Sequence, residues 1–104
     1  MANSQLSVNV TLLWENPSPS DPFAAQKLPL DLTKYTFVFI EAGAATAWLK
    51  VGGIRAHMYS NIVTSLRVRA CSAETDGVNF TAGYNNAKQD NSEVIPVRIF
   101  GINI

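Results

Sequence analysis

The sequence is poor in charged residues and carries one cysteine and one histidine. Eight basic and eight acidic residues cancel to a formal net charge of zero. This balance disfavours nucleic acid and membrane surfaces as partners, because both attract proteins with an excess of basic residues. The single cysteine, Cys71, excludes an internal disulfide and a zinc site made of four cysteines. We expect Cys71 to be buried as a small apolar side chain.

The chain also lacks the hydrophobic segments that target or anchor a protein. Its first ten residues have neither the charged region nor the apolar region of a signal peptide. The longest nearly apolar stretch, residues 35–49, is interrupted by Glu41 and Gly43 and is too short to span a bilayer. We therefore expect a soluble protein, and no membrane insertion.

The composition is that of a folded protein, since 47% of the residues are hydrophobic. A length of 104 residues suits one domain with a modest core, which we place at residues 1–104.

Alternation of apolar and polar residues predicts strands along most of the chain. Residues 6–12 and residues 25–32 both alternate, and Pro29 marks the second segment as an edge strand because proline cannot donate to a strand ladder. Residues 35–41 are apolar on both faces, which predicts a central strand.

Turn signals divide the second half of the chain. Gly52-Gly53 predicts a two-residue turn in a hairpin over residues 46–59, and Asp76-Gly77 predicts another turn. Between them, residues 61–70 place Leu66, Val68 and Ala70 on one face and two arginines, Arg67 and Arg69, on the other. A last strand over residues 93–104 is expected to be interrupted by Pro96 and Gly101.

No window favours a helix of useful length. About eight short strands at spacings near ten residues predict an all-β fold, an antiparallel β-sandwich of jelly-roll-like form. The proline-rich stretch at residues 16–22 lies between two strands that each need a partner. We therefore interpret it as a rigid loop across the end of the sandwich. The alternative, a proline-rich ligand for another domain, is only weakly matched.

Three groups of residues carry a resemblance to a known family. The first is Leu13-Trp14, Asn16-Pro17, Pro19, Phe23, Ala25, Gln26, Leu30, Leu32 and Tyr35. The second is Gly77, Phe80 and Gly83, and the third is Ile95-Pro96, Ile99, Phe100, Gly101 and Ile102. In this order they resemble a C-terminal domain of tail-fibre or receptor-binding-like proteins from phages and prophages of gut Firmicutes. The resemblance leaves residues 42–65 unmatched. It implies a β-rich fold, a place in the virion tail after synthesis in the host cytoplasm, and a homotrimer, because phage fibre tips are usually threefold.

Catalytic patterns are weak in this sequence. His57 alternates with Arg55 and Tyr59 along a predicted strand, which favours a structural or exposed histidine over a catalytic one. The acidic residues are scattered, and we find no ligand pattern for a transition metal. We expect no enzyme, no metal and no cofactor.

The polar loop at residues 83–93 is the candidate binding segment. Saccharides are typically held by an aromatic ring with amide and carboxylate groups around it, and binding residues concentrate on loops. The candidate ligand-binding residues are Tyr84, Asn85, Asn86, Asp90 and Asn91. The alternative interpretation is a solvated hairpin loop made of turn-forming residues.

Trp48, Met58 and Tyr59 lie on the predicted hairpin and are candidates for a subunit interface, where aromatic residues and methionine are enriched. We expect at least one of them to pack into the core instead.

Two candidate functions follow from these observations and from the resemblance. The first is a tail-fibre tip module that binds a host surface saccharide. The second is a structural module that trimerises or assembles the fibre and binds no small ligand.

Overall fold

The computed structural model describes residues 8–60, 67–82 and 92–103. These residues form eight strands and one short 3₁₀ helix, and no α-helix occurs among them. The elements are β1 (Asn9–Glu15), β2 (Gln26–Pro29), β3 (Phe37–Ala42), β4 (Thr46–Lys50), β5 (Ala56–Ser60), β6 (Arg67–Glu74), β7 (Gly77–Phe80), η1 (Ser92–Val94) and β8 (Pro96–Asn103).

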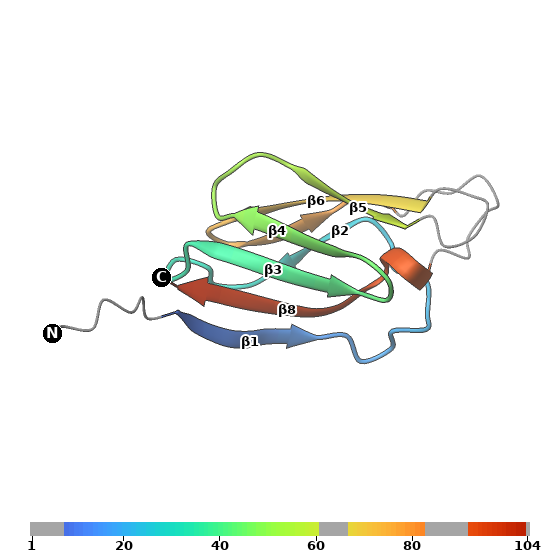
Figure 1. Cartoon of the computed structure of the whole chain (residues 1–104), viewed down its shortest axis with the longest axis horizontal. Helices are drawn as coiled ribbons and strands as arrows, with labels where there is room; N and C mark the ends of the chain where they lie inside the picture. The colour runs from blue at the N-terminus through green and yellow to red at the C-terminus, as the bar shows by residue number, and fades with distance from the viewer. Residues whose placement is uncertain (1–7, 61–66, 83–91, 104) are drawn as a thin grey trace, which may run out of the picture.

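The strands form two four-stranded sheets that face each other (Figure 1). Sheet A has the order β1-β8-β3-β4 and sheet B has the order β2-β7-β6-β5. Every pairing between these strands is antiparallel. The predicted all-β sandwich is therefore confirmed, whereas its jelly-roll form stays a prediction.

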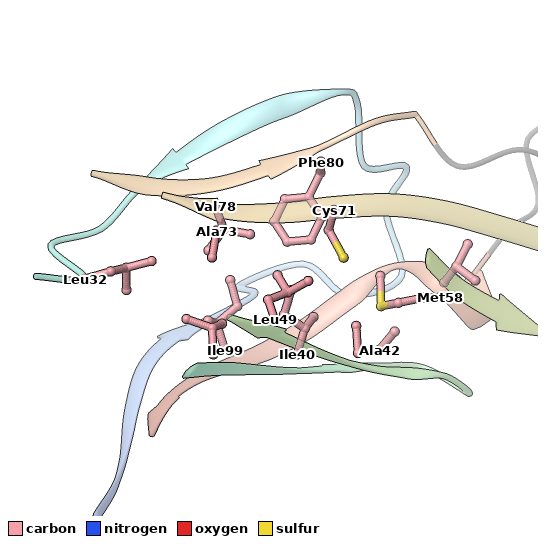
Figure 2. Packing of buried hydrophobic residues seen from close by; sticks show 13 residues of the cluster. Leu32, Ile40, Ala42, Leu49, Met58, Cys71, Ala73, Val78, Phe80 and Ile99 are labelled. Atoms are coloured by element: carbon pink, nitrogen blue, oxygen red, sulfur yellow. The ribbon is translucent and has the colours of Figure 1, made fainter. Parts of the chain in front are cut away.

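The core lies between the inner faces of the two sheets (Figure 2). Sheet A contributes Ile40, Leu49 and Ile99, and sheet B contributes Met58 and Cys71. Each fully buried aliphatic side chain of this kind stabilises the fold by roughly 1.5–3 kcal/mol. Cys71 is buried as predicted, and burial raises the pKa of its thiol to about 11.

Several strand predictions hold. The alternating segment at residues 25–32 contains the edge strand β2, which includes Pro29. The segment at residues 35–41 contains β3, which lies between β8 and β4 as a central strand. Asp76-Gly77 closes the hairpin of β6 and β7, in which Glu74 pairs with Gly77.

The hairpin predicted over residues 46–59 is wrong. β4 pairs with β3 in sheet A and β5 pairs with β6 in sheet B, so the intervening residues carry the chain from one sheet to the other. Gly52 has a φ of 81° and donates its N–H to the carbonyl of Ala73, while Gly53 donates to Lys50. The glycines make a turn as predicted, but this turn changes sheets instead of joining two paired strands.

The two arginines of β6, Arg67 and Arg69, lie on the buried side of their strand. Arg69 is only 1% exposed and donates from Nε to the carbonyl of Val94 at 2.8 Å and from Nη1 to that of Thr81 at 2.6 Å. Its guanidinium also lies 5.1 Å from the ring centroid of Phe23. Burial lowers the pKa of Arg69. The backbone carbonyls and the aromatic ring therefore replace much of the water that the cation loses.

The last strand is continuous, although we expected Pro96 and Gly101 to interrupt it. Pro96 is the first residue of β8, where a strand tolerates proline. A Cβ atom at Gly101 would lie 2.7 Å from the ring of Tyr35. Gly101 therefore makes room for this ring.

The proline-rich loop connects β1 of sheet A to β2 of sheet B. Asn16 attaches it to β8, because its backbone N–H donates to Val97 and its side-chain amide donates to Pro96. Further along the loop, Phe23 packs edge-on between Trp14 at 6.2 Å and Phe80 at 5.3 Å. These contacts make the loop part of the sandwich, as its place between two strands predicted.

Candidate functional site

The outer face of sheet A is the most distinctive surface of the described chain. Strand register places Leu12, Phe100, Phe39 and Trp48 side by side in one row across all four strands. A neighbouring row contains Val10, Ile102 and Phe37, and it ends on β4 at the exposed Lys50. We call the seven apolar residues of these two rows the apolar face.

Much of the apolar face is open to solvent. Trp48 is 61% exposed, Val10 59% and Leu12 49%. The ring of Phe39 lies 4.9 Å from that of Trp48 and 6.3 Å from that of Phe100, so the aromatic side chains form one continuous surface. Soluble monomers seldom expose a contiguous apolar patch larger than a few hundred Å², and such patches often mark interaction sites.

A charged row borders the apolar face on one side. Register aligns Glu15, Arg98 and Glu41 across β1, β8 and β3. Arg98 lies 3.5 Å from Glu15 and 2.9 Å from Glu41, and its hydrogen bond to Glu41 raises the pKa of Arg98. Exposed ion pairs contribute little to stability, so the row is more informative as a polar border than as a source of stability.

The outer face of sheet B is polar by comparison. Lys27 of β2 forms ion pairs with Glu74 at 3.2 Å and with Asp76 at 2.6 Å. The hydrogen bond from Lys27 lowers the pKa of Asp76. On β5, the ring of the exposed His57 stacks on the ring of Tyr59, with 5.9 Å between the ring centroids. This face has the character of an ordinary solvated surface.

The structure separates the three predicted interface residues. Trp48 and Tyr59 are both exposed, but they lie on the outer faces of different sheets. Met58 is 0% exposed and packs in the core, which is the position that we expected for at least one of the three. Its side chain has no surface left for a neighbouring subunit. The three residues share no surface, because β4 and β5 lie in different sheets and because Met58 and Tyr59 point to opposite faces of β5.

The candidate saccharide-binding residues lie outside the described residues. These are Tyr84, Asn85, Asn86, Asp90 and Asn91. Their role in binding stays a prediction. Glu93, at the end of the same polar segment, is described and lies 3.1 Å from Nε of the inward-pointing Arg67. Glu93 thus forms an ion pair with Arg67 at the end of the sandwich.

Other kinds of site are not evident in the described segments. No group of three histidine, cysteine or acidic residues within them is arranged to hold a metal ion. None of their helices has the length and apolar character needed to cross a membrane. Shallow hollows also occur on the surface formed by the described residues, and we name two of them. One is lined by Pro19, Ser20, Gly43, Ala44, Glu93 and Val97, and the other by Pro29, Leu30, Asp31, Thr33, Thr75 and Asp76.

Sequence reasoning missed the apolar face, although the sequence contained a signal for it. Phe37 and Phe39 alternate with the buried Val38 and Ile40, so both faces of β3 are apolar. We interpreted this pattern only as the mark of a central strand, which β3 is. In the described structure, one of these sides is the outer surface of the sheet.

Comparison with known proteins adds no relative. No family model, no curated protein and no solved structure matches the chain. Its function therefore has to be argued from its own geometry.

Proposed function

We propose that the chain is a structural module without catalytic activity, and that it assembles with further copies of itself through the apolar face. The observation that carries this proposal is the row of Leu12, Phe100, Phe39 and Trp48, which crosses the whole outer face of sheet A. The resemblance to phage tail-fibre domains supplies the setting, which is assembly of a virion fibre.

The positions of the exposed aromatic residues support assembly over recognition by loops. Trp48 lies within β4 and Tyr59 within β5, so both rings stand on strands. Aromatic residues on the outer face of a sheet suit packing against another protein surface. Burial of such a face in a complex removes apolar area from water, and this gain drives most protein association.

The proposal is tested by the molar mass in solution. Light scattering after size-exclusion chromatography separates assemblies from the 11.3 kDa monomer. We expect the wild-type protein to form an oligomer and Trp48→Lys to shift it toward monomer. Tyr59→Lys is the matched control, because it adds the same charge to an equally exposed aromatic position on the other sheet. A wild-type protein that stays monomeric at all concentrations would reject the proposal.

A saccharide-binding module is the second candidate, and the exposed ring of Trp48 favours it. An accessible indole beside the ring of Phe39 offers a surface on which the apolar side of a sugar can stack. A glycan array probed with the wild-type protein, Trp48→Ala and Tyr84→Ala tests this candidate. Loss of a sugar signal in Trp48→Ala would place binding on the sheet. Loss only in Tyr84→Ala would place it on the predicted loop, and no signal for the wild type would exclude the sugars tested.

A further inference from the structure

We infer that two copies of this chain pair face to face through the apolar face, about a twofold axis that runs parallel to the strands of sheet A. This inference rests on the proposed function and names the partner, which is a second copy of the same chain. The distribution of residues over the rows and strands of the face favours this arrangement.

A twofold axis between β8 and β3 brings apolar residues onto apolar residues. Rotation about this axis places β1 over β4 of the second copy and β8 over β3 of the second copy, while each row stays opposite itself. Leu12 then faces Trp48 of the second copy, and Phe100 faces Phe39 of the second copy. In the neighbouring row, Ile102 faces Phe37 of the second copy. Lys50 faces Val10 of the second copy at the edge of the pair, where the exposed ammonium group can stay in water while its aliphatic stem covers Val10.

The same axis makes the charged row complementary to itself. Arg98 faces Glu41 of the second copy, and Glu41 faces Arg98 of the second copy. Each copy thus contributes one cation and one anion to a cluster of four charges. Glu15 meets Thr46 of the second copy, so the described rows bring no like charges opposite each other. Complementarity of this kind sets the register of an interface and disfavours alternatives.

The other face-to-face twofold arrangement does not fit. An axis perpendicular to the strands would reverse the order of the rows. It would place Glu41 over Phe37 of the second copy and Arg98 over Ile102 of the second copy. Charges buried against apolar side chains lose their hydration without gaining a partner. The distribution of residues therefore selects the axis parallel to the strands.

The size of the face predicts weak pairing. Four strands spaced about 4.8 Å apart and about six residues long make a face of roughly 19 by 20 Å, or about 400 Å² per copy. Stable interfaces usually bury about 800 Å² per partner, and smaller ones are transient. We expect a dimer that forms in the micromolar range or above. A twofold pair uses one surface twice, and it differs from the threefold assembly that the resemblance implies.

Exchange of the two charges tests the pairing. Arg98→Glu alone opposes acidic residues across the axis, and Glu41→Arg alone opposes basic residues. We expect each single change to weaken dimerisation about tenfold or more, and the double exchange to restore it, because the four charges then alternate again. Sedimentation equilibrium from micromolar to near-millimolar concentration measures the dissociation constant. Lys27→Glu on sheet B is the control for charge reversal away from the face, and circular dichroism confirms that each variant is folded.

The outcomes separate this inference from the proposed function. A dimer that is weakened by both single changes and restored by the double exchange supports the twofold pairing. A trimer would overturn the twofold pairing and leave the assembly function standing. A dimer that is not restored by the exchange would overturn this register, and a monomer at every concentration would overturn both proposals.

Discussion

The two sheets of the sandwich differ in where they place charge and apolar surface. Sheet A carries its arginine, Arg98, on the outside and shows a broad apolar face beside it. Sheet B carries Arg69 on the inside and presents Lys27, His57 and Tyr59 to solvent. Alternation therefore divides a strand into two sides without specifying which side is buried.

The difference has a physical basis in the available partners. Arg69 is stable inside because the carbonyls of Val94 and Thr81 accept its N–H groups and the Phe23 ring lies beside it. The aromatic residues on the outside of sheet A contact one another across the strands, and Trp48 remains 61% exposed. The buried arginine thus finds two hydrogen-bond acceptors and a ring within one chain, whereas the outer face of sheet A leaves apolar surface for a partner.

The largest effect is expected from removal of the inner arginine. Arg69→Ala leaves a cavity, and it leaves the buried carbonyl of Val94 and the partly buried carbonyl of Thr81 without their donor. We therefore expect the free energy of unfolding to fall by about 3–5 kcal/mol. Arg98→Ala is the matched change on the outside of sheet A, and we expect it to alter stability far less because its ion pairs are exposed. Equilibrium unfolding in urea compares the two. Equal losses would contradict the assignment of Arg69 to the inside.

A smaller effect is expected from Gly101→Ala, on the inner side of sheet A. The added Cβ would press on the ring of Tyr35, so we expect a loss of about 1–3 kcal/mol. Tyr35→Leu in the same protein should recover part of this loss, because the smaller side chain vacates the space. Thermal unfolding of the single and double variants measures the coupling. Additive losses would show that the ring is not what limits residue 101.

The smallest effect is expected from Lys27→Met, on the outside of sheet B. Lys27 holds the pKa of Asp76 below its ordinary value of 3.8, and this contribution is present above that value and lost as the pH falls through the lowered pKa. The wild-type protein should therefore be slightly more stable than the variant at neutral pH and equal to it in strong acid. Melting temperatures measured from neutral pH to below the ordinary pKa of aspartate check this. If the difference in melting temperature between the two proteins stayed constant in acid, the effect would come from packing and not from the ion pair.

Much of the fold could be predicted from local patterns. Alternation and turn residues located most of the strands, Pro29 marked an edge, and the apolar run at residues 35–41 marked a central strand. The partners of β4 and β5 could not be predicted, because Gly52-Gly53 specifies a turn but not whether the strands beside it pair or separate. The side of Arg69 depends on carbonyls and a ring that are distant in sequence.

The candidate site was predictable only in part. Trp48 was identified as an interface residue from its type, and its exposure agrees with a role in contacts to a partner. The apolar face as a whole requires the register of four strands, two of them from opposite ends of the described chain. Single-strand patterns contain no such information.

The place of β8 in sheet A affects when this protein can fold during its synthesis. β8 lies between β1 and β3, and it is the last strand in the sequence. All four strands of sheet B have been made once residue 80 has left the ribosome, whereas β1 cannot join sheet A until β8 emerges. Asn9 of β1 pairs with Asn103 of β8, so this contact joins residues that are far apart in the sequence. Sheet A therefore stays incomplete until residue 103 has been translated. Until then its apolar strands are exposed, and chaperones can bind them.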